Sequence, residues 1–283
     1  MKRVIPLLSL GALALLVGAC GSGGGGPAVP TIQKARTFEL AGFEPTGPIE
    51  PGKPVKVSFF IRQPSGKPLT TYKRGAGPHT GLHLIFVRND LATIIHKHPP
   101  IGPDGRATEN ITFPSPGKYR LIVDAYPNLS GPLRNFQLFR NLQVGTTDPK
   151  KPLPPFKASQ TVDGYHVQLM GKPKLRAIEA ALMKVKVTDP NGKPAKFVPY
   201  FGALAHAIFF RSGNLDYFHT HVCAPGAAGC TSLLGGASVT GRSSTPGNLT
   251  VGVLLPEPGR WRLFIQFESG RTLVTAPFTL NVA

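Results

Sequence analysis

Six of the eight histidines in this chain occur at two copies of one spacing, His-x12-His-x-His. The first triad is His83, His96 and His98, and the second triad, 123 residues later, is His206, His219 and His221. Clustered imidazoles are the ligands that borderline divalent metals use in proteins. A site made only of nitrogen ligands favours Cu(II) or Zn(II), so copper and zinc are the expected metals.

The sequence around the two triads also repeats. The motif at residues 64–68 (PSGKP) precedes the first triad, and 190–194 (PNGKP) precedes the second. After the triads, 116–121 (PGKYRL) corresponds to 258–263 (PGRWRL). Matching landmarks in one order, with length changes between them, predict an internal duplication.

The composition predicts an all-β protein. Glycine and proline are abundant, at 33 and 30 residues, and the apolar stretches between them are short. We expect two tandem immunoglobulin-like β-sandwich domains at 31–145 and 158–283, joined by a proline-rich linker at 146–157. Residues 175–183 are compatible with either a helix or the meeting of two strands. Strands are expected at 37–41, 55–62, 82–88, 92–97, 108–113, 118–124, 136–144, 165–170, 182–187, 204–211, 216–222, 248–254, 260–267 and 272–282.

The N-terminus has the pattern of a bacterial lipoprotein leader. Lys2 and Arg3 precede a short apolar run that ends in small residues and Cys20. This arrangement resembles a lipobox, which implies a signal peptide at 1–19 and a lipid-modified Cys20. Residues 20–30 are glycine-rich and are expected to form a flexible tether. An uncleaved anchor helix is the alternative. The expected location is therefore the extracytoplasmic face of a bacterial cell membrane.

The chain is strongly basic, with a formal net charge of +18 that falls to +16 when Lys2 and Arg3 are removed. Charge of this size affects solubility and association rather than fold. Nucleic acid is not expected as a partner of an exported protein without a nucleic-acid motif. Anionic lipid headgroups or acidic wall polymers are more plausible neighbours, and a solvated surface without a dedicated partner is the alternative. The sequence predicts no particular protein partner.

Two cysteines remain besides Cys20. Cys223 and Cys230 lie in a loop rich in proline, glycine and alanine, directly after the second triad. In an oxidising compartment we expect them to form a disulfide. Ligation of a metal by these thiols, beside the histidines, is the alternative.

Hairpin geometry predicts that each triad shares one face of a sheet. A two-residue turn at Gly213 and Asn214 sets His206 opposite His221 and Ile208 opposite His219. Directly opposed Cβ atoms lie about 5 Å apart and diagonal ones about 7–8 Å apart, so three imidazoles could reach one ion. The first triad has the same spacing, which places His83 near His98 or His96, and His79 could add a fourth ligand.

The segment 205–221 (AHAIFFRSGNLDYFHTH) resembles a recurring segment of exported bacterial β-sandwich domains, some of them similar to YtkA-like or heavy-metal-linked modules. Those domains have a Gly-His strand, a turn with Gly-Asp and a His-x-His-Pro end. This chain has Ala205 and Leu82 in place of the glycine, and Val222 in place of the proline that the first copy keeps as Pro99. The resemblance implies the sandwich fold and metal handling.

Two functions remain open from the sequence. The first is a membrane-anchored exported lipoprotein that binds Cu(II) or Zn(II) through its histidine triads. The second is a non-catalytic envelope adhesion or interaction module whose histidines are architectural, because duplication copies structural residues as faithfully as ligands. The sequence contains no Gly-x-Ser-x-Gly elbow, phosphate loop or His-Glu-x-x-His motif, so we expect no enzymatic activity.

Overall fold

The structure is a computed structural model, and it describes residues 37–73, 81–130, 135–223, 233–234, 237–238, 241–243 and 245–283. Every regular element in these ranges is a β-strand, which confirms the all-β prediction. The described part of the chain has no helix of the length and hydropathy needed to cross a membrane. Residues Arg36–Ala283 form one compact unit.

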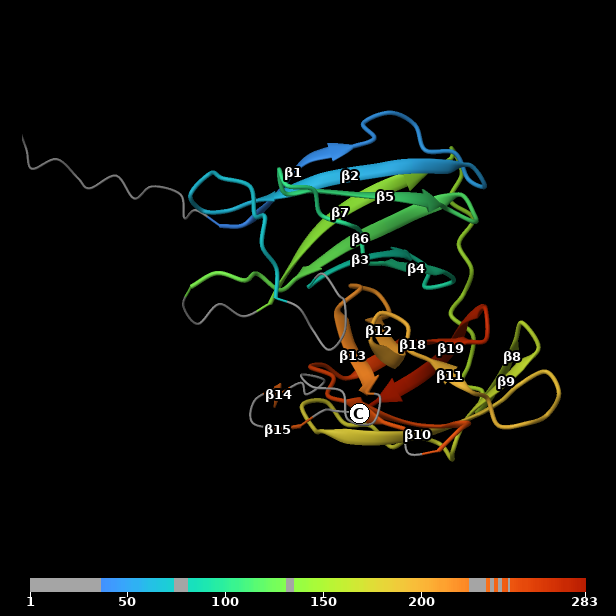
Figure 1. Ribbon diagram of the computed structural model, residues 1–283. Helices are drawn as coiled ribbons and strands as arrows, with labels where there is room; N and C mark the ends of the chain where they lie inside the picture. The colour runs from blue at the N-terminus through green and yellow to red at the C-terminus, as the bar shows by residue number, and fades with distance from the viewer. Residues whose placement is uncertain are drawn as a thin grey trace, which may run out of the picture. The chain divides into compact units, whose positions relative to one another are not determined.

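The first half of this unit is a sandwich of two antiparallel sheets (Figure 1). The three-stranded sheet has the order β1 (Glu39–Glu44), β2 (Pro54–Arg62), β5 (Arg106–Thr112). The four-stranded sheet has the order β4 (Ile94–Lys97), β3 (Leu82–Arg88), β6 (Gly117–Ala125), β7 (Phe136–Val144). Alternate residues of both sheets, among them Phe59, Phe86 and Tyr119, fill the core between them.

The second half contains one long sheet that supplies both layers of a second sandwich. Its path is β11 (Phe197–Val198), β18 (Gly259–Ser269), β12 (Ala203–Arg211), β13 (Tyr217–Cys223), β16 (Gly241–Arg242), β17 (Asn248–Val253), β10 (Ala181–Thr188), β9 (Tyr165–Leu169), β8 (Ser159–Val162), with β19 (Thr272–Val282) paired to β18. A separate hairpin is formed by β14 (Leu233–Leu234) and β15 (Ala237–Ser238).

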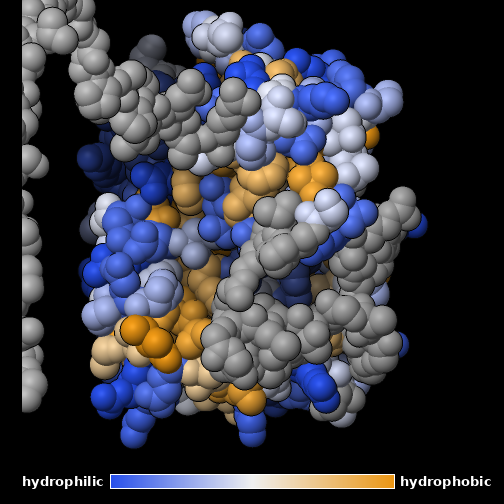
Figure 2. Space-filling model, turned by 90° about the vertical axis from the view of Figure 1, so that its left-hand side faces the viewer, coloured by the Kyte–Doolittle hydropathy of each residue, from blue (hydrophilic) through white to orange (hydrophobic). Residues whose placement is uncertain are grey.

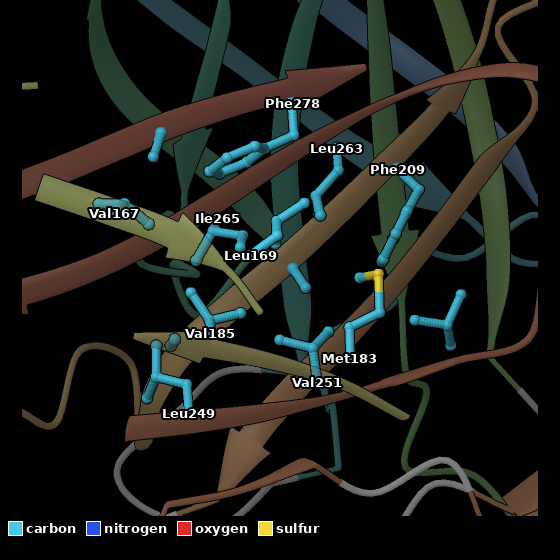
Figure 3. Close-up of a cluster of buried hydrophobic side chains, with 14 of the residues drawn as sticks. Val167, Leu169, Met183, Val185, Phe209, Leu249, Val251, Leu263, Ile265 and Phe278 are labelled. Carbon is cyan, nitrogen blue, oxygen red and sulfur yellow. The ribbon is translucent and has the colours of Figure 1, made fainter. Parts of the chain in front are cut away.

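The core of the second sandwich is shared by its two layers. Val167, Met183 and Val251 come from β9, β10 and β17, and they pack with Phe209 and Ile265 from β12 and β18 (Figure 3). Side chains alternate across a strand, so this core uses only one face of β12 and β18. The opposite face of these strands is available for a second contact.

That second contact joins the two sandwiches. On β3 the even-numbered residues face the first core, whereas Ile85 and Val87 belong to a different apolar cluster. The same cluster contains Ile208 and Phe210 from β12 and Phe264 from β18. Both faces of β3 and β12 are therefore covered by apolar side chains, and the four-stranded sheet packs directly on the β13-β12-β18 layer.

Polar contacts attach the linker to the end of β3 in the first sandwich. Arg88 and Asp90 form a buried ion pair, and the Arg88 guanidinium also donates to the carbonyl of Pro149 at 2.6 Å. The Asp90 carboxylate accepts from the backbone N–H of Lys151 at 2.9 Å. The segment 146–157 contains no strand, as its prolines predict, and it is held against the first sandwich by these bonds.

All fourteen expected strands are present, with ends that differ by a few residues. The short strands β8, β11, β14, β15 and β16 were not expected, because two to four residues carry too little alternation to be recognised. Residues 175–180 form no helix and lead directly into β10, which starts at Ala181. The division into separate tandem domains and the duplication stay predictions.

The shared cluster predicts that a change on the outer face of β12 destabilises the whole unit. Phe210 is fully buried between the sandwiches, so Phe210→Ala should lower the free energy of unfolding by about 3–5 kcal/mol, measured by urea denaturation. Phe139 is 54% exposed, and Phe139→Ala serves as the control, with an expected change of about 0.5 kcal/mol or less. Equal effects of the two substitutions would contradict packing at this junction.

Candidate metal centre

The predicted hairpin registers are present in both halves. His206 pairs with His221, and Ile208 pairs with His219, between β12 and β13. In the first half Ile85 pairs with His96 between β3 and β4, which is the equivalent register. Each triad therefore lies on one face of its hairpin, and that face is the one turned toward the other sandwich.

The turn that produces this register is longer than expected. Arg211 and Asp216 close the hairpin through a backbone hydrogen bond of 2.9 Å, and the N–H of Leu215 donates to the carbonyl of Arg211 at 3.0 Å. Four residues thus form the loop in place of the predicted two-residue turn. The register survives because both lengths are even. The longer loop also places Leu215 in the apolar cluster between the sandwiches.

The two triads meet in one group of six histidines. The ring centroids of His83 and His219 are 4.8 Å apart, and those of His96 and His206 are 4.9 Å apart, in both cases across the junction. Within the triads, Nε2 of His98 lies 3.1 Å from Nε2 of His96. The sequence predicted two separate sites, whereas packing of the sandwiches brings the six rings into a single centre.

Two sets of three histidines place ligand atoms close enough for one ion. The first set is His83, His96 and His219, and the second is His206, His219 and His221. In each set the ligand atoms lie within 4.8 Å of one another. The first set takes residues from both sandwiches, and His219 belongs to both sets. The second set is the predicted second triad.

Neighbouring groups orient the ring of His96. Its Nδ1 lies 3.0 Å from Oε1 of Gln266, whose amide Nε2 donates to Oγ1 of Thr275 at 3.0 Å. The amide oxygen of Gln266 therefore accepts the Nδ1–H of His96. In the neutral ring the lone pair is then on Nε2, which lies 3.4 Å from Nδ1 of His83 inside the cluster. This is how residues behind a metal site direct ligands.

The ring of His206 is fixed in the same way by the backbone. Its Nε2 lies 2.8 Å from the carbonyl oxygen of Tyr200, which can only accept, so Nε2 carries the proton. The lone pair of His206 is then on Nδ1, 3.1 Å from Nε2 of His219. If Nε2 of His219 donates this bond, its Nδ1 holds a lone pair. That Nδ1 is buried, and no hydrogen-bond donor among the described residues reaches it.

Burial keeps these imidazoles neutral. Removal from water lowers the pKa of His96 to about 3, partly offset by its hydrogen bond to Gln266. Burial also lowers the pKa of His83, His206 and His219 well below the usual value, and repulsion among neighbouring imidazolium forms lowers it further. Neutral imidazole is the form that binds metal, so the ligands are already in the required protonation state at neutral pH.

A buried carboxylate lies beside the cluster. Asp124 on β6 pairs directly with His83 on β3 and is only 1% exposed. Its carboxylate accepts from Asn135 and Gln137 in the first half and from the hydroxyl of Tyr217, at 3.3 Å, in the second. Burial raises the pKa of Asp124 to about 6, against the lowering effect of these hydrogen bonds. At neutral pH it can provide negative charge next to the imidazoles.

Access to the centre lies on the side of His98, His219 and His221. These three are partly buried, whereas His83, His96 and His206 are at most 5% exposed. An ion approaching from solvent would therefore meet the partly buried rings first. The ring of Phe201 stacks on that of His98, with centroids 3.8 Å apart.

Sequence reasoning missed Gln266, Asp124 and the junction itself. A usable signal was present, because LHLIFV in β3 and HAIFF in β12 are apolar at nearly every position, which indicates strands covered on both faces. Several expected features lie outside the described residues: Cys20 with the leader and tether, His79 and Cys230. The Cys223–Cys230 disulfide therefore stays a prediction, with Cys223 buried at the end of β13.

Comparison with protein families gives one match that covers most of the chain. The sequence model of a family described as a domain of unknown function, DUF8832, matches residues 37–137 and 160–283. The two matched segments correspond to the two sandwiches. Among curated proteins, none matches the chain.

Solved structures give only distant similarities. The chain is similar to the Escherichia coli adhesin FdeC (11% identity, 88% of this chain and 65% of that chain, TM-score 0.24). It is also similar to invasin, a bacterial integrin-binding protein (14% identity, 87% and 38%, TM-score 0.23). A Salmonella alpha-2-macroglobulin is 13% identical over 88% of this chain, which spans 15% of its length, with a TM-score of 0.25. Similarities this weak carry no functional argument.

The lowered histidine pKa values predict acid sensitivity of the metal-free protein. The unfolded chain binds protons on these histidines below about pH 6.5 while the folded chain does not, so stability falls as pH decreases. Each histidine that stays neutral in the folded chain lowers the free energy of unfolding by up to about 1.4 kcal/mol for each pH unit below that value. Asp124 acts in the opposite direction below pH 6, but it is one group against four.

Urea denaturation with a chelator at pH 7.5 and pH 5 measures this effect. The wild-type midpoint should be clearly lower at pH 5, and a variant with the four histidines His83, His96, His206 and His219 changed to Gln should lose most of the difference. The exposed His166 on β9 provides the control, since His166→Gln should leave the pH dependence unchanged. A midpoint that does not move between the two pH values would contradict neutral, buried imidazoles.

Proposed function

The chain belongs to the DUF8832 family, and we propose that it binds a divalent metal ion, Cu(II) or Zn(II), at the six-histidine centre between its sandwiches. The observation that carries the proposal is the direction of the nitrogen lone pairs. His96 and His206 each donate their outer N–H to a fixed acceptor, Gln266 or the Tyr200 carbonyl, so that the lone pairs of their inner nitrogens point into the cluster, where an ion would be coordinated.

The spacing of the nitrogens suits a small ion. A tetrahedral zinc site with bonds of about 2.0–2.1 Å has nitrogen–nitrogen edges of about 3.3 Å. Neighbouring ring nitrogens in the cluster are separated by 3.1 Å for His206 and His219 and by 3.4 Å for His83 and His96. Each of these edges belongs to a different set of three, and the third ligand atom of each set lies within 4.8 Å of the other two.

The ligand chemistry restricts the choice of metal. All candidate ligands are imidazole nitrogens, which suit Zn(II) and Cu(II) better than the oxygen-seeking Mg²⁺ or Ca²⁺. Met183 is buried in the core of the second sandwich and Met170 lies at the end of β9, so neither belongs to the histidine cluster. A methionine-lined Cu(I) site is therefore not proposed. No enzymatic activity is proposed either.

We further propose that the protein is exported and lipid-anchored through Cys20, and that the sandwiches are immunoglobulin-like domains related by duplication. The leader pattern before Cys20 supports the first point. Equal registers in the two histidine hairpins support the second, together with the correspondence of Asp124 and Gln266. These two residues lie at the same distance after the PGKYRL and PGRWRL motifs, and both lie behind the histidines.

A second candidate function rests on burial. His206 is fully buried and His96 is 2% exposed, as expected of histidines that serve as architecture. The nitrogen–nitrogen contacts of 3.1 Å can also be ordinary hydrogen bonds between neutral rings. On this interpretation the hydrogen-bonded histidines only fix the two sandwiches relative to each other, and the protein is an envelope interaction module. The two candidates differ in whether removal of the histidines changes metal affinity or only stability.

Metal titration separates them. We expect the mature chain, produced without a histidine tag, to bind Zn(II) or Cu(II) with a Kd of about 1 µM or tighter at pH 7.5, and to lose binding at pH 5 because protons compete for the imidazoles. Since the centre takes ligands from both sandwiches, His96→Ala and His219→Ala should each weaken binding by at least about tenfold. Calorimetric titration measures these affinities.

The matched control is His166→Ala, which removes an exposed histidine far from the junction in sequence. If His96→Ala leaves the affinity unchanged while His219→Ala abolishes binding, the second triad binds the ion alone and the shared centre is wrong. If affinity is unchanged after all six histidines are replaced by Gln, the architectural function remains.

The position of Asp124 predicts a contribution of charge to affinity. Asp124→Asn keeps the size of the side chain but removes the buried negative charge beside His83, so metal affinity should fall by about 10–100-fold. The control is Asp104→Asn at an exposed turn, for which titration should show no change. Unchanged affinity in Asp124→Asn, with the fold intact by circular dichroism, would exclude this role.

A further inference from the structure

The outer face of the second sandwich combines exposed apolar and basic side chains. One row crosses four strands, with Met170 after β9, Lys184 on β10, Thr250 on β17 and Arg242 on β16. The alternation of β10 places Leu182 and Lys186 on the same face as Lys184. We name this set, Met170, Leu182, Lys184, Lys186 and Arg242, the basic-apolar face.

The apolar members of this face are well exposed. Met170 is 54% exposed and Leu182 is 64% exposed, and they lie on neighbouring strands as diagonal neighbours, about 7–8 Å apart. Ile178, in the segment that leads into β10, is 80% exposed. Figure 2 shows apolar residues beside hydrophilic ones in the lower part of the view, over the second sandwich. Single exposed apolar residues are ordinary, whereas neighbouring ones surrounded by charged residues are typical of an interaction surface.

The charges around this face are predominantly positive. Lys172 and Lys174 follow Met170 and are exposed, and they extend the basic surface beyond the sheet. Glu179 is the acidic residue of this segment, and its carboxylate is already paired with Arg176 at 3.5 Å. A partner that matches this face must therefore present negative charge together with an apolar layer into which side chains can insert.

We infer that the basic-apolar face docks on an anionic lipid bilayer. Lysine and arginine side chains reach lipid phosphates, while Met170 and Leu182 enter the boundary between headgroups and acyl chains. A polyanion without an apolar layer would pair with the basic residues and leave the side chains of Met170 and Leu182 in water. The inference does not depend on the metal centre, which lies on the other layer of the second sandwich.

Vesicle co-sedimentation tests the inference with the mature chain carrying Cys20→Ala, so that no acyl chain contributes. The chain should bind phosphatidylglycerol vesicles and not phosphatidylcholine vesicles. Each lysine near a charged membrane contributes about fivefold to partitioning, so Lys184→Gln with Lys186→Gln should weaken binding by about 25-fold. Met170→Ser with Leu182→Ser should weaken it by about tenfold.

Matched controls lie on the first sandwich. Lys56→Gln with Lys67→Gln makes the same change of charge at exposed sites, and Phe139→Ser removes a 54% exposed apolar side chain. Both controls should leave vesicle binding nearly unchanged. Equal loss in the control and test variants would show unspecific attraction by net charge and would overturn the inference. Binding to a soluble anionic polymer that survives the two serine substitutions, without binding to vesicles, would assign the face to acidic wall polymers.

Discussion

Face-to-face packing of two sheets determines where every other feature of this protein lies. One face of β3 packs in the core of the first sandwich, and one face of β12 packs in the core of the second. The opposite faces of these two strands contribute to the apolar cluster between the sandwiches. Ile85 and Phe210 belong to one apolar cluster, and the histidines continue the same faces beyond it. Because side chains alternate, a shift of one residue in either hairpin would turn the apolar residues and the imidazoles away together.

The cost of burying charge gives this arrangement its chemistry. The imidazoles packed in this junction cannot all be protonated, and the lowered pKa values of His83, His96, His206 and His219 express that constraint. Neutral rings leave one lone pair each, and the acceptors behind His96 and His206 determine that these lone pairs point inward. If the cluster were purely structural, each of these lone pairs would need a hydrogen-bond donor. No donor among the described residues reaches Nδ1 of His219.

Local signals in the sequence were sufficient for the longer strands and for the register of the second hairpin. The pairing of His206 with His221 followed from alternation and from an even loop length, although the loop itself has four residues. The single centre could not be predicted in this way, because it depends on contacts between residues more than one hundred positions apart. His96 and Gln266 are 170 positions apart, and no local motif around either residue indicates that the two are in contact.

The two halves differ where they hold the histidines, and the difference has a physical consequence. Asp124 lies opposite His83, whereas Gln266 lies at the equivalent place opposite His206. Two carboxylates at these positions would bring two buried charges into one junction, and two amides would leave a bound cation without a counter-charge. One of each gives His96 a neutral acceptor and gives the cluster a single negative neighbour. In this respect the two sandwiches are complementary, and the centre needs both.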